Sequence, residues 1–254
     1  MIDIHSHVVW GVDDGARSME ESIAMLEAAH ESGTTDIVAT PHANAEYTYE
    51  PELVEERIGE LAARTNGTPK IHRACEFHLN FDNVDHLLER PFPYTINGKQ
   101  YLLIECPDFH VGRHTDTVFR RLVAAGLTPI VAHPERNPVM RKELERLERW
   151  VELGCLMQIT ALSLLGGFGG TAKAASLRLL GRGLVHIVAS DAHDPVRRHP
   201  RLDEAYRIVR SRCDEDTAEM LFTDNPRAVV EGRSLAGGKL VPWQPAARWY
   251  EFWR

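Results

Sequence analysis

Two histidines near the start of the chain, His5 and His7, stand two residues apart on an apolar segment that begins at Ile2. Alternate residues of a β-strand point to the same face, so a strand here would project both imidazoles in one direction. Two neutral imidazoles on one face form a chelating edge for a divalent metal ion. An isolated HxH pair is equally consistent with ordinary polar residues at a strand end, so the rest of the chain must decide.

Further side chains that can bind metals follow the other apolar segments. Each lies at or just beyond the end of such a segment; these residues are Asp14, His42, Glu76, Glu105, His133, Asp191 and His193. Asp14 is expected in a tight Asp13-Asp14-Gly15 turn after the first strand. Each residue has a structural alternative, such as a solvated carboxylate, a turn histidine or a helix cap. A carboxylate carried inward on an apolar strand, as at Glu105, nevertheless needs a cation to offset its desolvation. Together the nine residues favour a metal site.

The elements that would position these residues alternate along the chain. Strands are expected at IDIHSH, TDIVAT, KIHRACE, YLLIE, TPIVAH, CLMQIT and GLVHIVASD, and the second of them is broken by Pro41. Helices are expected from a cap at Ser18 to Gly33, from Pro51 to Arg64, near Val84, and over residues 115–125, 141–153, 171–180 and 201–231. Strands that alternate with helices indicate a parallel sheet with helical crossovers.

Two architectures have this pattern, a closed barrel and an open doubly wound sheet. A barrel brings the carboxyl ends of all its strands to one face, where the polar residues could meet. A flat sheet would spread them too widely. We therefore expect one α/β domain over residues 1–254, built as a barrel.

Composition excludes several classes of protein. The chain has 254 residues and a net charge of −8, with the charges interspersed, which argues against nucleic-acid binding. No apolar run approaches the length that membrane insertion requires, and no signal peptide is expected because core residues follow Met1 directly. The four cysteines have no paired spacing, so we expect reduced thiols in a cytoplasmic protein.

Several of these motifs resemble those of a known family. The segments IDIHSH, GVDDGA, TPH, CEF, LLIEC, AHPER and SDAH, in this order, resemble the polymerase and histidinol phosphatase (PHP) superfamily. They are most similar to its bacterial tyrosine-phosphatase branch, the CpsB/CapC-like enzymes of capsule and exopolysaccharide biosynthesis, for which GVDDGA together with AHPER is specific. The resemblance runs from about Ile2 to Leu235 and leaves the aromatic tail, residues 236–254, outside.

The resemblance implies a distorted (β/α)7 TIM-like barrel, the PHP fold, with three divalent metals per chain. Manganese is favoured, and iron and zinc are alternatives. By position, one metal would be held by His5, His7, Glu76 and Asp191, a second by Glu76, Glu105 and His133, and a third by Asp14, His42 and His193. Arg136 and Arg198 match the family's phosphate-binding arginines and are the catalytic and substrate-binding candidates; Arg197 competes with Arg198 for that role.

The resemblance also implies the reaction. A hydroxide that bridges two metals would attack phosphorus in line, on a phosphotyrosine of a bacterial tyrosine autokinase of capsule biosynthesis. Alternatives are a PHP phosphatase for a small phosphomonoester such as histidinol phosphate, an amidohydrolase, and a non-catalytic metal-bound scaffold of the polysaccharide machinery. A thiol phosphatase is disfavoured because Arg113 follows Cys106 one residue too late to close a phosphate loop, so Cys75 and Cys106 are expected to be packing residues.

Two segments have no assigned role. The glycine-rich GGFGGTAK, residues 166–173, lacks the lysine spacing of a nucleotide-binding loop, and we expect a flexible loop capped by Thr171, with the lining of a substrate cleft as the alternative. The tail is expected to pack on the barrel exterior or to form a contact in a homo-oligomer, because so much aromatic area is costly to leave exposed.

Overall fold

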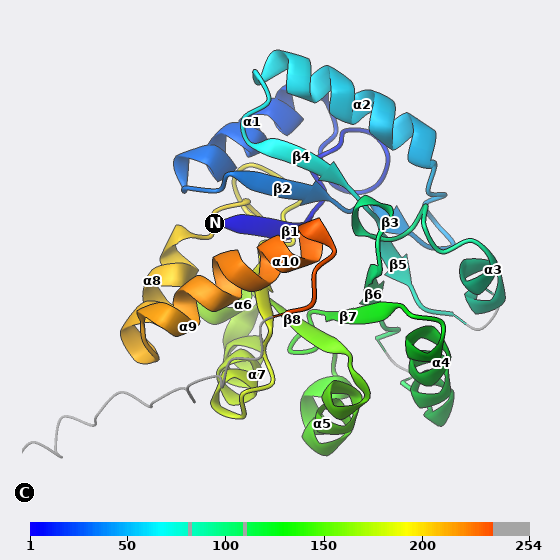
Figure 1. Cartoon of the computed structure of the whole chain (residues 1–254). Helices are drawn as coiled ribbons and strands as arrows, with labels where there is room; N and C mark the ends of the chain where they lie inside the picture. Colours follow the sequence, from blue (N-terminus) through cyan, green and yellow to red (C-terminus); the bar gives the residue numbers. More distant parts are fainter. Residues whose placement is uncertain (81–82, 109–110, 236–254) are drawn as a thin grey trace, which may run out of the picture.

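Short parallel strands alternate with helices in the computed structural model, which describes residues 1–80, 83–108 and 111–235 (Figure 1). The aromatic tail predicted to pack or to mediate oligomers lies outside the described residues. The strands are β1 (Ile2–Ser6), β2 (Asp36–Ala39), β3 (His42–Ala43), β4 (Lys70–Arg73), β5 (Glu76–His78), β6 (Tyr101–Glu105), β7 (Thr128–Ala132), β8 (Leu156–Thr160) and β9 (Ile187–Ala189). Seven strands were expected; the second and third are each split in two.

The helices surround these strands and agree with the predicted segments except for α6, which was not predicted, and short 3₁₀ and π turns are added (Figure 1). They are α1 (Met19–Glu31), α2 (Pro51–Arg64), α3 (Val84–Glu89), α4 (Arg113–Ala124), α5 (Leu144–Leu153), α6 (Ala161–Leu165), α7 (Gly169–Gly181), α8 (Asp203–Arg212), α9 (Glu215–Glu219) and α10 (Asn225–Glu231), with turns η1 (Ile96–Gly98), η2 (Met140–Lys142) and η3 (Met220–Asp224).

The ends of two helices test the capping predictions. The Ser18 hydroxyl accepts from the Glu21 N–H at 3.3 Å and caps α1, as predicted. The prediction for Thr171 is wrong, because α7 begins two residues earlier, with Phe168 at the N-cap position and no side-chain cap. The helix starts early because α6 ends at Leu165 with Gly166 as its left-handed C-cap, and the chain turns within three residues into α7.

The described strands form two parallel sheets, in the orders β1-β2-β4 and β3-β5-β6-β7-β8-β9. The prediction of a single closed barrel is therefore not confirmed. Between β2 and β3 stands Pro41, which has no N–H to donate to a ladder. A second interruption lies between the first and last strands. Here β1 and the segment after β9 are joined only by an isolated β-bridge between Ser6 and Ala192, and not by a ladder. We call this bridge the β1–β9 seam.

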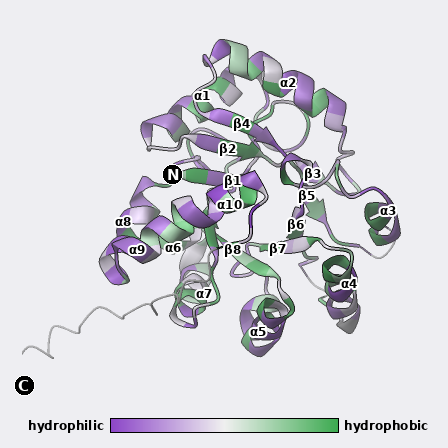
Figure 2. Cartoon of the chain, viewed as in Figure 1, coloured by the Kyte–Doolittle hydropathy of each residue, from purple (hydrophilic) through white to green (hydrophobic). Residues whose placement is uncertain are grey.

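Hydrophobic residues fill both faces of the sheets. Ile4, Leu103, Ile130 and Ile187 lie together in one buried cluster on the inner side. The largest cluster, which includes Phe119, lies between the six-stranded sheet and its helices. Outer helices such as α2 and α4 carry hydrophilic and hydrophobic residues in alternation, as expected for elements with one buried face (Figure 2).

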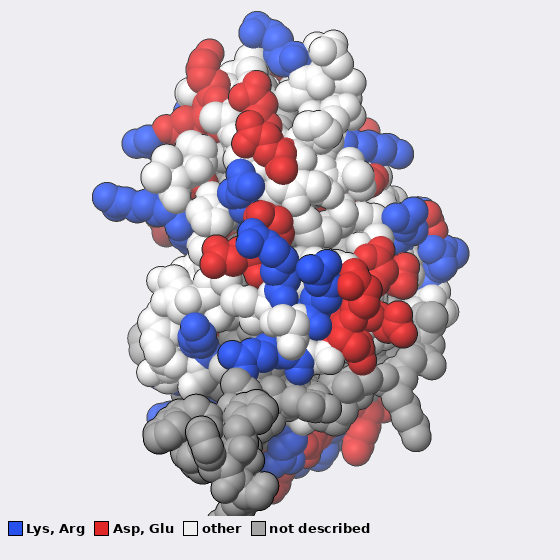
Figure 3. All heavy atoms as spheres, turned by 90° about the vertical axis from the view of Figure 1, so that its left-hand side faces the viewer, with Lys and Arg blue, Asp and Glu red and all other residues white. Residues whose placement is uncertain are grey.

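Charged side chains cover the exterior in mixed order. On the face drawn in Figure 3, basic and acidic groups lie next to one another. Elsewhere along the chain, pairs such as Arg207 with Asp203 in α8 form ion pairs at 2.9 Å. Among the described residues, no helix has the length and apolar character needed to span a membrane.

Candidate metal centre

Nine predicted side chains gather where the strands end. Their donor atoms form four overlapping groups, each within 4.8 Å: His7, Asp14, His42 and His193; His5, His7 and Glu76; His5, His133 and Asp191; His42, Glu76 and Glu105. Most of them follow a strand or lie at its end, whereas His42 and Glu76 begin the short strands β3 and β5. These two residues are direct partners in the parallel register of β3 and β5, which places them side by side.

The β1–β9 seam joins the two ends of the arrangement. The His7 N–H donates to the Ala192 carbonyl and the Asp191 N–H donates to the His5 carbonyl, both at 2.8 Å. These two hydrogen bonds hold His5 and His7 next to Asp191 and His193, which follow the last strand. Asp191 and His133 have positive φ angles of 51° and 32°, a conformation that costs free energy in residues other than glycine and is typical of functional sites.

Glu76 lies at the centre of the cluster and is 1% exposed. Its Oε1 accepts a hydrogen bond from His133 Nε2 at 2.8 Å and lies 3.3 Å from His5 Nε2. Burial disfavours the carboxylate, but the imidazoles of His5, His133 and His42 outweigh burial and hold the pKa of Glu76 well below its usual range. This side chain is therefore a permanent negative charge among histidines.

Two buried atoms at the centre lack hydrogen-bond partners within the described structure, Glu76 Oε2 and His42 Nδ1. They lie 3.0 Å apart without hydrogen-bond geometry. A divalent cation satisfies a carboxylate oxygen and an imidazole lone pair together, and mixed imidazole and carboxylate donors suit manganese, iron or zinc. The residues present therefore fit bound metals.

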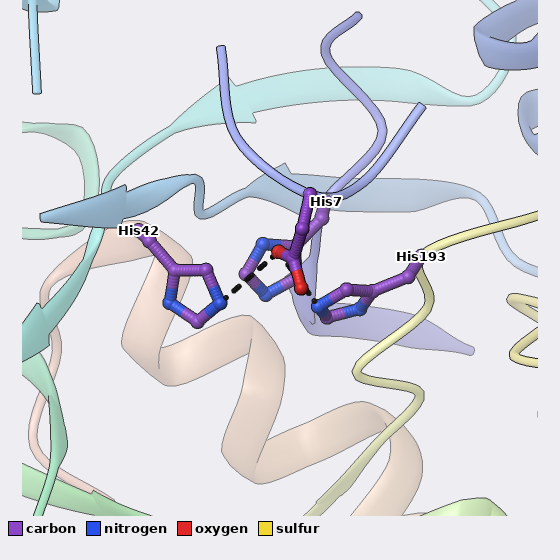
Figure 4. Close-up of side chains that lie close together, drawn as sticks. His7, His42 and His193 are labelled. Atoms are coloured by element: carbon purple, nitrogen blue, oxygen red, sulfur yellow. Dashed lines mark ion pairs between the residues drawn. The ribbon is translucent and has the colours of Figure 1, made fainter. Parts of the chain in front are cut away.

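A second part of the cluster surrounds Asp14. Figure 4 shows His42 and His193 on either side of a carboxylate, with His7 between them. The carboxylate is that of Asp14, whose Oδ1 lies 3.3 Å from His42 Nε2 and 3.4 Å from His193 Nε2. Burial and the neighbouring His7 lower the pKa of His193 to about 4, so this imidazole is neutral at pH 7, as a metal ligand must be.

Two residues that the sequence did not single out orient the first histidines. Asp13 Oδ2 lies 2.6 Å from His7 Nδ1 and also accepts from the His42 N–H at 3.0 Å. Gln158 Oε1 lies 2.9 Å from His5 Nδ1. When Nδ1 donates to such an acceptor, the lone pair is left on Nε2, which points toward Glu76 and Asp191. Although burial opposes the charged form, Asp13 raises the pKa of His7 to about 9, so a metal that binds at Nε2 has to displace a proton.

The two predicted arginines reach the same carboxylate. Arg136 Nη1 donates to Asp191 Oδ2, and Arg198 Nη2 donates to the same oxygen at 2.8 Å. Arg197 is exposed and its backbone N–H donates to Asp194. Arg136 and Arg198 therefore donate directly to a carboxylate of the cluster, whereas the hydrogen bond of Arg197 is made by its backbone.

A polar cavity of about 650 Å³ opens beside the cluster. Its lining includes Asp14 and His193 from the donor set, together with Arg17, Arg197 and Arg198. The carboxylates of Asp14, Glu21 and Asp194 also line it, and a volume in this range accommodates a small organic group.

Comparison with known proteins agrees with the sequence motifs. The sequence model of the family described as "Capsular polysaccharide synthesis, CpsB/CapC" matches residues 1–231. The chain is 35% identical over 243 residues to tyrosine-protein phosphatase YwqE of Bacillus subtilis, covering 92% of this chain and 93% of YwqE. It is 34% identical over 239 residues to tyrosine-protein phosphatase CpsB of Streptococcus pneumoniae, covering 91% of this chain and 98% of CpsB.

The structural comparison gives the same family. A chain from the crystal structures of YwqE and CpsB, which are described as unique metal-dependent tyrosine phosphatases, superposes with a TM-score of 0.87 at 35% identity. The match covers 98% of this chain and 100% of the other. The resemblance to the CpsB/CapC-like branch of PHP phosphatases is thereby confirmed, and the chain belongs to the CpsB/CapC family of capsular polysaccharide synthesis.

Proposed function

We propose that this chain is a metal-dependent protein-tyrosine phosphatase whose substrate is a tyrosine autokinase of capsule or exopolysaccharide synthesis. The observation that carries the proposal is the meeting of nine metal donors and two arginines at one end of the strands. Relatives that share about a third of their residues with this chain over nine tenths of its length are named tyrosine-protein phosphatases. We also propose a single catalytic domain over residues 1–254 that works in the cytoplasm with reduced cysteines, of which Cys75, Cys106 and Cys155 are buried and Cys213 is partly buried.

The proposed ligands are the nine donors of the cluster. By the family's positions, one metal is assigned to His5, His7, Glu76 and Asp191, a second to Glu76, Glu105 and His133, and a third to Asp14, His42 and His193; all nine belong to the overlapping donor groups of the cluster. Manganese is the favoured ion because carboxylates contribute to each set. When bound, such cations activate water for attack on phosphorus and neutralise the charge that develops there.

The protein's own groups bind and orient the phosphoryl group. Each guanidinium offers two parallel N–H donors, which match a pair of phosphoryl oxygens as the single ammonium of lysine cannot. Arg136 and Arg198 are already directed to the cluster by Asp191, so their donors are placed before substrate arrives. Asp13 and Gln158 hold the imidazoles of His7 and His5 in one orientation. A tyrosine leaves with a pKa near 10, which lessens the need for a general acid.

The test compares substrates and metals. Purified protein should hydrolyse a phosphotyrosine peptide faster than histidinol phosphate, lose this activity in EDTA and recover it with Mn²⁺. Arg136→Ala should lower kcat by about 100-fold, since removing one charge-stabilising donor costs that much. Arg182→Ala, at a surface pair with Glu148 (2.9 Å), is the matched control and should leave activity unchanged. Activity that survives chelation, or a faster rate on histidinol phosphate, would overturn the proposal.

A further inference from the structure

An aromatic ring lies against both arginines of the site. The Cζ atom of Arg136 lies 4.3 Å from the centre of the Phe168 ring, and that of Arg198 lies 5.6 Å from it. Both distances are within the range of an attractive contact between a cation and the face of an aromatic ring. Phe168 is partly buried, and it belongs to the glycine-rich segment to which the sequence assigned no role.

The glycine-rich loop directs this ring toward the arginines. Gly166 and Gly169, on either side, have φ angles of 96° and 86°, which residues with a Cβ rarely adopt. The Gly167 N–H donates to the Leu162 carbonyl at 2.8 Å, and the Gly169 N–H donates to the Gly166 carbonyl at 2.9 Å. The loop is therefore a defined turn between α6 and α7.

The order of the strands explains why this loop can reach both arginines. Arg136 lies in the loop after β7 and Arg198 in the loop after β9, while the glycine-rich loop follows β8 and α6. Since β8 lies between β7 and β9 in the sheet, its following segment lies between the two loops that carry the arginines. The ring of Phe168 thus bridges two loops that are far apart in sequence.

The arginines need this second support. Both donate to one oxygen of Asp191, and Arg198 Nη2 also donates to the Asp191 backbone carbonyl at 3.1 Å, so two positive groups converge on one residue. Arg198 Nε is buried and has no hydrogen-bond partner in the part of the chain that the structure describes. A long arginine side chain loses rotamer entropy when it is fixed. An aromatic face restrains a guanidinium without occupying its N–H donors, which remain available for oxygens of a ligand.

We infer that Phe168 is a positioning residue for phosphate binding: its ring holds the guanidinium groups of Arg136 and Arg198 side by side and leaves available the N–H donors that are not bonded to Asp191. This inference rests on the proposed phosphatase function. It assigns to the glycine-rich loop a role in binding the phosphoryl group, which a flexible linker between helices would not have.

The experiment replaces the ring and then restores it. Phe168→Leu and Phe168→Met remove the aromatic face but keep an apolar side chain. Both should raise the KM for p-nitrophenyl phosphate and the inhibition constant of inorganic phosphate by about tenfold, with a smaller change in kcat. Phe168→Tyr and Phe168→Trp keep a ring and should restore both constants to within about twofold. Phe92→Leu, at a side chain that is 61% exposed, is the matched control.

The outcomes separate the two proposals. A wild-type protein without phosphatase activity contradicts the proposed function itself. An active wild-type protein whose Phe168→Leu and Phe168→Met variants keep the original KM and phosphate inhibition contradicts only the role of Phe168. If the aromatic variants fail to restore phosphate binding at an unchanged Tm, the residue acts by filling space, and the inference is also wrong.

Discussion

Asp13 offers the sharpest test of how the metal donors are held. Its carboxylate accepts three contacts: Oδ2 from His7 Nδ1 at 2.6 Å and from the His42 N–H at 3.0 Å, and Oδ1 from the Gly15 N–H at 2.9 Å. Two of these contacts fix residues assigned to different metals. The change Asp13→Asn keeps the shape of the side chain but removes its charge and one acceptor oxygen.

The expected effect follows from those contacts. If the asparagine oxygen stays with His7 and His42, the amide N–H₂ faces the Gly15 N–H and that hydrogen bond is lost. The bond to His7 also loses its charge assistance, and hydrogen bonds to charged groups contribute about 1.5–3 kcal/mol. Loss of such a partner behind a ligand histidine typically weakens metal binding by 10–100-fold. We therefore expect the apparent Kd for Mn²⁺ to rise by about 10–100-fold, which is about 1.4–2.7 kcal/mol of binding free energy.

The assay titrates metal-free protein with Mn²⁺ and follows p-nitrophenyl phosphate hydrolysis. Asp36→Asn is the matched control, because Asp36 Oδ1 lies 3.0 Å from His72 Nε2 in a similar pair, at the start of β2 and away from the donor cluster. That variant should lose stability but keep its Mn²⁺ dependence. If Asp13→Asn shows the same Mn²⁺ titration curve as the wild type, the argument that Asp13 organises the site is refuted.

Three further predictions concern stability and the thiols. His186 Nδ1 accepts from the Met157 N–H at 3.1 Å, and burial lowers its pKa to about 4 from 6.5. As the pH falls, the unfolded chain binds a proton at this imidazole more readily than the folded chain does. The stabilisation is therefore complete above about pH 6.5, and the free energy of unfolding falls by about 2 kcal/mol at pH 5. Urea unfolding should show that His186→Asn, whose oxygen can accept the same bond, lacks this loss. A Cβ on Gly15 would lie 2.3 Å from the His7 carbonyl oxygen, whereas one on Gly59 in α2 meets nothing within 4 Å. Gly15→Ala should therefore lower both Tm and Mn²⁺ affinity, while Gly59→Ala raises stability by about 0.5–1 kcal/mol; an unchanged Tm for Gly15→Ala would contradict the contact. Burial raises the pKa of Cys106 to about 12, so Cys106→Ala should keep kcat within about threefold and wild-type activity should withstand iodoacetamide; inactivation by the reagent would point to a thiol mechanism.

The sequence was informative where a property is local. The spacing of His5 and His7 and the carboxylate after the apolar YLLI segment depend only on the strand they occupy, and the structure places both in the cluster. The cap at Ser18 and the start of α2 at Pro51 are likewise set by neighbouring residues. The break in the third strand at Ala74 and Cys75 carries no local signal comparable to Pro41, so it could not be predicted.

Contacts between segments that are distant along the chain could not be predicted from the sequence. His5 and Gln158 are 153 residues apart, and only the approach of β1 and β8 makes the amide the partner of this imidazole. The polar Gln158 in the apolar CLMQIT segment was the available signal, since a buried amide needs a partner. The position of Phe168 over two arginines has no signal in a glycine-rich segment, because the positive φ angles that turn the ring follow from the packing of the loop on α6.

The division of the strands into two sheets explains why the gathering of the nine side chains could be predicted although a closed barrel could not. What the site requires is that particular strand ends be neighbours, and this depends on pairwise register. His42 is opposite Glu76 in β3 and β5, and His78 is opposite Glu105 in β5 and β6. At the β1–β9 seam, where a ladder is missing, two hydrogen bonds of 2.8 Å still hold the residues around His5 and His7 beside Asp191. At this seam the backbone is not held in a regular ladder, and Asp191 adopts a positive φ angle. In this conformation its carboxylate faces His5 and His7 and accepts from the two arginines, Arg136 and Arg198. A continuous ladder would hold this residue in extended conformation, so the irregularity of the sheet is a condition for the site.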